Sequence, residues 1–441
     1  MGIDTKIRKV IGEGVANRAF YEGMPPDYIP APGRGANKWM LLKDSLTDAN
    51  YFRGLSGHNT DPSKGRMEYT FTGDEFYKEF MGDVWAALSS GHFRVVVMCV
   101  DIQEWVPSEK HAEQKKRSVA RSKGPTITPV PDDARIGKHG IRTGDGPWKR
   151  FDIRACMKNR RWRANLWKYL MTRVYKSAAL PVGTCIIFDY EATGPIMVQR
   201  PLKSQAMTRY RLVEHIHGYG EADRQIPYWM HQFPSLNVVL DSVDSDFLPI
   251  ICHYIWTHGR KRAIVWKYYR KKACHLNLTA LNLFRKWGVS SIQFLTSCVL
   301  CGTDFFDKQL VLSRIGIDAV FYGVEHARIE GDALDRLVVT DDDVSILAYE
   351  EILRHIYTVY FKAKFDASRA KVKPTWFDLP LKGTPASSAR IRRLVEERKL
   401  TKSIKYPSSE TIIKTHDRLM FNLVYWGVRW KDTVVNTPFR V

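Results

Sequence analysis

Apolar runs that are each followed by an acidic residue place the strongest limit on how this chain can fold. The clearest is Phe93–Val100, a continuous run of β-prone residues that is followed by Asp101. A continuous apolar run is typical of a parallel strand with both faces covered by helices, so this segment predicts a central strand of an open α/β sheet. Asp101 is then expected at the carboxyl edge of the sheet, where such folds bind their ligands.

Further runs repeat this pattern. Trp39–Leu42 precedes Asp44, although Asp44 taken by itself is more typical of a helix N-cap or a turn. Asn237–Leu240 precedes Asp244 and Asp246, whose side chains face the same way in an extended chain because they are two residues apart. Two more strand-like runs extend the expected sheet: Val182–Tyr190 and Ala263–Tyr268.

Helical spacing of apolar residues predicts a helix over Asp74–Leu88, and we also expect a helix over Met207–His217. Leu276–Trp287 and Ser290–Cys301 read as two further helices, the second almost wholly apolar. Thr126–Gly146 contains Pro, Gly and Asp without periodicity, which predicts a mobile loop.

More acids gather between residues 220 and 304. The sequence Gly-Glu-Ala-Asp at 220–223 contains Glu221 and Asp223. Asp304 follows the predicted helix Ser290–Cys301. Like charges held together need protons or cations, so convergence of these acids predicts a divalent metal site. The structural alternative is that Glu221 and Asp223 begin a helix, where the backbone dipole favours carboxylates.

The charge of the whole chain points to a polyanionic partner. Its 441 residues carry a formal net charge of +21, which favours nucleic acid as a partner. A chain of this length is enough for two or three domains, or for one large enzyme with insertions. No apolar run is long enough to span a bilayer, so we expect no membrane partner. Seven scattered cysteines suit an intracellular, reducing compartment, nuclear or cytoplasmic; protein partners stay unknown.

Basic and aromatic residues alternate in the segments 148–176 and 253–272. Cationic side chains hold phosphates and aromatic rings stack on bases, so both segments are expected to contact nucleic acid. An amphipathic helix with a basic face would give a similar pattern. The candidate nucleic-acid contacts are Arg121, Arg160, Arg161, Trp162, Arg163, Lys267 and Arg270.

Taken in order, these motifs resemble those of the flap endonuclease/XPG family of 5′ nucleases. The set consists of Met-Gly-Ile at the start of the sequence, the strand before Asp101, Gly-Glu-Ala-Asp at 220–223, Asp-Ser-Asp at 244–246 and Gly-Thr-Asp at 302–304. The resemblance covers roughly residues 1 to 310.

The resemblance implies an α/β fold with a PIN-like nuclease core, in which a central mainly parallel sheet is flanked by helices. This core would span residues 1–310 with a basic arch-like insertion at 107–180, followed by a mainly helical region at 311–441. Lys110 and Arg117 match the family's catalytic basic pair near the scissile phosphate, and Gly2 matches a glycine close to the substrate. The implied metal ligands are Asp44, Asp101, Glu221, Asp223, Asp244, Asp246 and Asp304.

The activity implied is a structure-specific 5′ nuclease that uses two Mg²⁺ or Mn²⁺ ions to hydrolyse phosphodiester bonds in DNA flaps or ends. The family's duplex-gripping hairpin has only a partial match at 314–320, which lacks the second glycine. An RNA-directed nuclease of the same fold, either a 5′-to-3′ exoribonuclease or an mRNA-degrading endoribonuclease, therefore stays open. A third alternative is a protein that binds nucleic acid without cutting it.

Overall fold

The computed structural model describes the strands and helices of one compact unit of the chain, together with four buried residues of a second unit, Phe247, Ile250, Ile251 and Tyr254. The described residues are 39–45, 70–101, 128–177, 179–203, 206–215, 221–242, 244, 247, 250–251, 254, 264–269 and 272–275.

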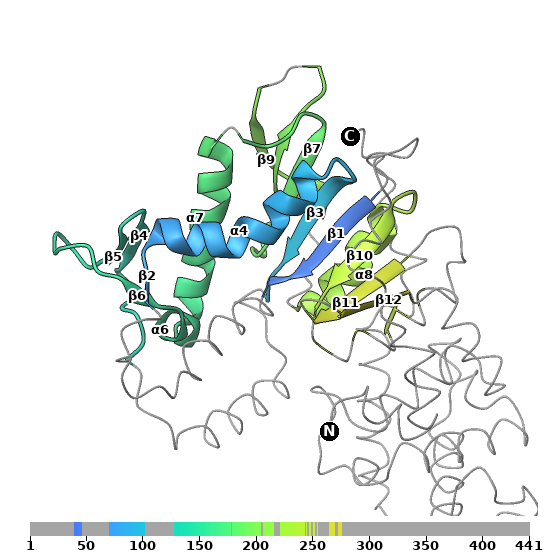
Figure 1. Ribbon diagram of the computed structural model, residues 1–441. Coiled ribbons are helices and arrows are strands. Elements are labelled where there is room, and N and C mark those ends of the chain that lie inside the picture. The colour runs from blue at the N-terminus through green and yellow to red at the C-terminus, as the bar shows by residue number, and fades with distance from the viewer. Residues whose placement is uncertain are drawn as a thin grey trace, which may run out of the picture. The chain divides into compact units, whose positions relative to one another are not determined.

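An eight-stranded mixed sheet forms the centre of the first unit (Figure 1). Its strand order is β12-β11-β10-β1-β3-β7-β8-β9, and the five strands from β11 to β7 are parallel. The parallel strands are β1 (Trp39–Asp44), β3 (Phe93–Cys99), β7 (Thr184–Asp189), β10 (Asn237–Asp241) and β11 (Ile264–Tyr269). The antiparallel edge strands are β8 (Ile196–Arg200), β9 (Thr208–Arg211) and β12 (Lys272–His275).

The order of the parallel strands reverses at β1. Counted along the chain, β1, β3, β7, β10 and β11 are the first to the fifth, so the spatial order from β7 to β11 is 3-2-1-4-5. This is the order of a doubly wound sheet, whose switch point lies where the first strand meets the fourth. Here the switch point lies between β1 and β10, which pair in register from Trp39↔Asn237 to Lys43↔Asp241.

Helices cover both faces of the sheet. One face is covered by α4 (Gly73–Ser89) and α7 (Arg160–Ser177), and the short α6 (Ile153–Lys158) precedes α7. These two helices form a core with Leu41, Val96 and Met98 of the strands. On the other face α8 (Ala222–Gln232) lies against the ends of β3 and β7. The connection to β10 runs back across the sheet, and right-handed crossovers require its helix on the opposite face from α4 and α7.

The described part of the chain confirms the expected mixed α/β architecture with a mostly parallel central sheet. All five parallel strands and α4 lie within two residues of their predicted limits. The helix predicted over Met207–His217 is wrong, because this segment forms the edge strand β9 and a short 3₁₀ turn, η2 (Val213–His215). β9 pairs with the preceding strand β8 at the edge of the sheet, and three of its four residues are exposed, so no apolar run marks it as a strand.

The loop predicted over Thr126–Gly146 is also wrong in its second half. Residues 135–142 form a hairpin of two short strands, β4 (Arg135–Gly137) and β5 (Gly140–Arg142). A second small sheet pairs β2 (Thr70–Phe71) with β6 (Phe151–Asp152). Within the expected insertion at 107–180, α7 contributes Trp162, Trp167 and Leu170 to the core. The later predicted helices, the boundary at residue 310 and the region 311–441 lie outside the described residues.

No helix in the described ranges is both long and apolar enough to cross a membrane.

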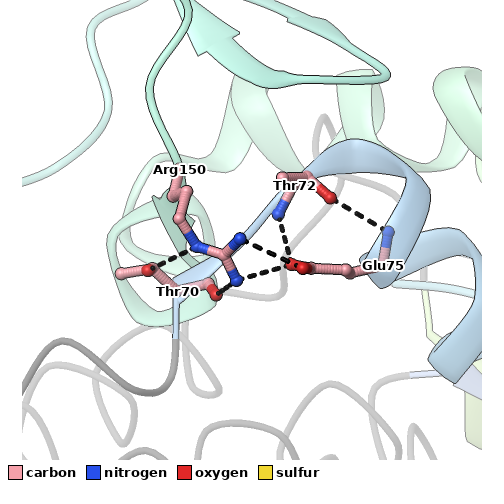
Figure 2. A network of polar contacts seen from close by, with 4 residues as sticks. All are labelled: Thr70, Thr72, Glu75 and Arg150. Carbon is pink, nitrogen blue, oxygen red and sulfur yellow. Dashed lines mark hydrogen bonds and ion pairs between the residues drawn. The ribbon is translucent and has the colours of Figure 1, made fainter.

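A polar network joins the start of α4 to the small sheet beside it (Figure 2). Thr72 and Glu75 form a capping box: Glu75 N donates to Thr72 Oγ1 at 3.2 Å, and Thr72 N donates to Glu75 Oε2 at 2.9 Å. The Arg150 guanidinium binds both oxygens of the Glu75 carboxylate, at 3.0 and 2.6 Å, and also donates to the Thr70 carbonyl. The chain entering β6 is thereby fixed to the first turn of α4.

We expect this network to stabilise the fold only where Glu75 is ionised. The hydrogen bonds from Arg150, and then from the Thr72 backbone, hold the pKa of Glu75 below its ordinary value. Their contribution is therefore complete above pH 4.5, the ordinary pKa of the group, and is lost as pH falls through the folded-state pKa. Glu75→Gln should lower the melting temperature near neutral pH, and the gap from the parent protein should close on acidification.

Glu79→Gln is the control, because Glu79 is exposed on the same helix outside this network. A gap of equal size at every pH would contradict the assignment.

A buried ion pair crosses the switch point. Lys43 Nζ lies 3.1 Å from Asp241 Oδ2, and the two side chains are 1% and 13% exposed. Removal of one partner leaves the other charge buried, which costs about 3 kcal/mol or more. Asp241→Asn should therefore lower the free energy of unfolding by about 3 kcal/mol, measured by urea titration.

Glu191→Gln provides the comparison, since Glu191 pairs with Arg211 at 2.8 Å with both side chains about a third exposed. Its loss should cost less than about 1 kcal/mol. Equal losses in the two variants would show that the Lys43–Asp241 pair does not hold the switch point.

Candidate functional site

Acidic residues lie at the carboxyl ends of four consecutive strands, β10, β1, β3 and β7. The register aligns Asp44 of β1 with Cys99 of β3, and Cys99 with Asp189 of β7. Aligned residues of parallel strands project from the same face, and here that is the face covered by α8. Strands are about 4.8 Å apart, so the Asp44 and Asp189 backbones are separated by about 10 Å.

Asp189 lies beneath α8 and is fully buried, with 0% of its surface exposed. Trp229 of α8 donates its indole Nε1–H to Asp189 Oδ2 at 2.7 Å. A charged acceptor makes this bond stronger than a neutral one. The bond therefore ties the helix to the end of β7 and offsets part of the cost of burying a carboxylate there.

The first turn of α8 is attached to the end of β3. The Gln225 side chain pairs with both backbone groups of Val100: Val100 N donates to Oε1 and Nε2 donates to Val100 O, each at 3.0 Å. One residue further on, Asp101 Oδ1 accepts a hydrogen bond from Ala222 N at 3.3 Å. Glu221 and Asp223 flank that amide and are 1% and 8% exposed. Three predicted acids thus meet at one helix N-terminus, where the backbone dipole lowers the cost of their charge.

Ser242 links the acids on either side of the switch point. Its hydroxyl donates to Asp44 Oδ2 at 2.9 Å and accepts from Asp244 N at 3.1 Å. Asp44 is buried, whereas Asp244 is exposed. The loop after β10 is therefore folded back onto the end of β1, and it presents a carboxylate to solvent at that edge.

Cys99 lies between two of these acids but adds no charge to them. Burial raises the pKa of its thiol well above the ordinary value, and the neighbouring carboxylates of Asp189 and Asp44 raise it further. The thiol thus stays protonated, and a protonated thiol is a poor metal ligand. Oxygen donors are left as the ligands that this edge can offer.

The structure groups five of the seven predicted metal ligands at this edge: Asp44, Asp101, Glu221, Asp223 and Asp244. Among the residues it describes, no three His, Cys, Asp or Glu side chains converge closely enough to hold one ion. The other predicted site residues outside the described ranges are Gly2, Lys110, Arg117, Arg121, Asp246, Arg270 and Asp304.

The predicted nucleic-acid contacts on α7 need one correction. Trp162 is 0% exposed and donates its indole N–H to Ala134 O at 3.2 Å, so its ring belongs to the core and has no face for a base. Arg160 and Arg161 lie in the first turn of α7, Arg163 lies one residue past Trp162, and Lys267 lies in β11. Whether these four bind nucleic acid stays a prediction.

Sequence reasoning missed two acids of this edge, Asp189 and Asp241. Each is the last residue of a parallel strand, so the signal that identified Asp101, an apolar run closed by an acid, was available for both. Asp189 was counted within its strand, and Asp241 was passed over for the pair of acids that follows it.

No protein-family model matches the chain, and no curated protein matches it either. The carboxyl edge therefore has to be interpreted from its own geometry.

We expect the bond between Trp229 and Asp189 to stabilise the edge more than a neutral hydrogen bond would. Trp229→Phe keeps most of the ring and removes the donor, so the free energy of unfolding should fall by about 2 kcal/mol. Trp162→Phe is the matched control, because it removes an indole donor that faces a neutral carbonyl and should cost about 1 kcal/mol. Urea titrations of both variants measure the difference. A larger loss for Trp162→Phe would contradict the role given to Asp189.

Proposed function

We propose that this chain is a divalent-metal-dependent nuclease that hydrolyses phosphodiester bonds, with DNA flaps or ends as its first substrate. One observation carries the proposal: acids from the ends of β1, β3 and β10 and from the start of α8 gather at the switch point of a 3-2-1-4-5 sheet. Open α/β sheets bind their ligands at that place. In this proposal residues 1–310 form a PIN-like core and 311–441 a mainly helical extension.

The acids at this edge fit Mg²⁺ or Mn²⁺ better than other metals. They are carboxylates without a histidine among them, and the one thiol in the row, Cys99, is held protonated. Hard carboxylate and water oxygens are the donors that these cations prefer. Asp44, Asp101, Glu221, Asp223 and Asp244 would supply part of the ligands of two ions, and the proposal adds Asp246 and Asp304 to complete the set. When bound, the ions would supply an activated water and neutralise charge on the leaving oxygen.

The residues around these acids have a supporting role. The Ser242 hydroxyl and the Ala222 amide orient the Asp44 and Asp101 carboxylates through their hydrogen bonds. Fixed orientation matters because ligands that must reorganise bind a cation less tightly. Asp189 lies deeper under α8 and adds negative charge behind the ligands. Lys110 and Arg117 are the proposed cations for the scissile phosphate.

The charge of the chain supports a nucleic-acid substrate. A net charge of +21 attracts a polyanion, whereas the carboxyl edge by itself would repel one. Carboxylates grouped next to the phosphates of a bound nucleic acid would need cations between the two. The buried thiols Cys99, Cys156 and Cys185 are free, as expected in an intracellular reducing compartment.

The test is cleavage of labelled 5′-flap DNA, single-stranded DNA and RNA in Mg²⁺, Mn²⁺ or EDTA. We expect cleavage that needs the metal, with Asp44→Asn and Asp101→Asn each slowing it by at least about 100-fold. Because each substitution removes a like charge from a crowded edge, the melting temperature should stay the same or rise. Glu79→Gln, on the exposed side of α4, should change neither quantity.

Cleavage that survives EDTA or both substitutions would overturn the metal-dependent mechanism. Faster cutting of RNA than of any DNA would replace the proposed substrate by RNA. Binding without cleavage in every metal would leave a nucleic-acid-binding protein.

A further inference from the structure

The β4–β5 hairpin and the chain that follows it form a basic surface that the proposed active site does not use. Residues 135–150 contain five Arg and Lys residues and one acid, Asp145. Arg135, Lys138 and Lys149 are exposed, and Arg142 is half-buried. The same segment holds Trp148, which is 38% exposed, one of the few large apolar side chains left open among the described residues.

The register places two arginines and this tryptophan in one row. Arg135 lies directly opposite Arg142, and Ile141 bridges to Lys149 on the other side of β5. Trp148, one residue before Lys149, is therefore the neighbour of Arg142 on the side away from Arg135. The Arg142 guanidinium lies 4.8 Å from the centroid of the Trp148 ring. We call Arg135, Arg142 and Trp148 the hairpin face.

The opposite side of the hairpin is used for packing. Ile136 and Ile141 are partly buried against the core formed by α4 and α7. Neighbouring residues of a strand project to opposite faces, so the hairpin face is turned away from that core. Its exposed ring and its charges are consequently not explained by packing within the unit.

The hairpin is held rigidly at the start of α4. Asp74 N donates to Lys138 O at 3.0 Å, and a Cβ on Gly73 would lie 2.0 Å from the Gly137 carbonyl oxygen. A Cβ on Gly137 would in turn lie 2.6 Å from the Trp148 ring, so the ring packs closely against this glycine. Arg150 adds the network of Figure 2 at the end of the segment. A fixed surface loses little conformational entropy when it binds.

Topology puts this hairpin toward the carboxyl edge of the sheet, the edge at which the acids lie. Trp39 N donates to His92 O, so the start of β1 and the chain between α4 and β3 lie together at the amino edge. Helix α4 therefore runs from the carboxyl side to the amino side, antiparallel to the strands (Figure 1). Its first turn, which holds the hairpin, is its end on the carboxyl side.

The two arginines lie opposite each other at a cost. Like charges directly opposite on paired strands destabilise a hairpin. Neither Arg135 nor Arg142 forms an ion pair with any residue that the structure describes. The Arg142–Trp148 contact offsets part of this repulsion, and a bound anion would remove more of it.

We propose that the hairpin face binds single-stranded nucleic acid, with a base stacked on Trp148 and backbone phosphates on Arg135 and Arg142. The choice of partner rests on the proposed function, while the surface itself stands on its own geometry. Stacking on an exposed aromatic ring next to cations is the common mode for single strands. In a duplex the bases are already stacked on one another, so Trp148 should discriminate in favour of single strands.

The test measures binding in the absence of cleavage. Anisotropy of a labelled single-stranded oligonucleotide is titrated with the full chain in EDTA, and the titration is repeated with a duplex of the same sequence. Trp148→Ala should weaken single-strand binding by about 5-fold to 100-fold and duplex binding by less. Arg135→Gln and Arg142→Gln should each make the slope of log affinity against log salt less negative by about 0.7.

A matched pair elsewhere supplies the control. Tyr210 of β9 is 41% exposed and Arg209 beside it is exposed too, so Tyr210→Ala and Arg209→Gln remove an aromatic ring and a cation from another surface, outside the two segments expected to contact nucleic acid. These two variants should bind like the parent chain. Arg135→Gln has a second readout: it should leave the melting temperature unchanged or raise it while weakening binding, because it relieves the arginine repulsion. Loss of a residue with only a structural role would not weaken binding while leaving the melting temperature the same or higher.

Several outcomes would overturn the proposal: no binding of single strands, equal losses in the Trp148 and Tyr210 variants, or losses that are as large for duplex as for single strands. If Trp148→Ala does not fold, the two arginine variants and their salt slopes decide. If binding follows these expectations but no substrate is cut, the proposed nuclease activity fails and the hairpin face stands. If cutting is normal and Trp148→Ala binds normally, only the hairpin proposal fails.

Discussion

The parallel pairing of β1 with both β10 and β3 is the constraint on which the rest of this unit depends. It makes a strand from the start of the described chain the neighbour of one that lies about 200 residues later. Two side-chain links cross this junction, one on each face: Lys43 to Asp241 and Ser242 to Asp44. Asp44, Asp241 and Asp244 lie together because this junction brings both parts of the chain to one place.

The edge shows how a fold tolerates several carboxylates close together. Trp229 binds Asp189, Lys43 binds Asp241, and the start of α8 receives Asp101 through the Ala222 amide. Cys99 remains neutral in the same row. These partners lower the cost of the charge. A group of carboxylates of this kind stands out in a chain of net charge +21.

Sequence patterns were sufficient for the five parallel strands and for the place of most acids, because buried parallel strands are continuous apolar runs. They failed for strands at the sheet edge, as in β9, which pairs with β8 on one side only and has three exposed residues out of four, so it carries no apolar run. Trp162 was misjudged for another reason. It shares a helical stripe with Leu166 and Leu170, and that spacing indicates a core face, whereas its alternation with arginines predicts a binding surface.

The acidic edge and the hairpin face make opposite demands on a nucleic acid. The edge would repel phosphates until the proposed cations bind, whereas the proposed hairpin face would attract them without metal. Affinity without metal should therefore come from the hairpin and the other basic surfaces, and added metal should increase affinity through the edge alone. Both lie toward the carboxyl ends of the strands, so in these proposals a single strand held at Trp148 would be bound on that side of the unit. Chemistry and strand selection would then belong to separate groups of residues that share one helix, α4, as their spacer.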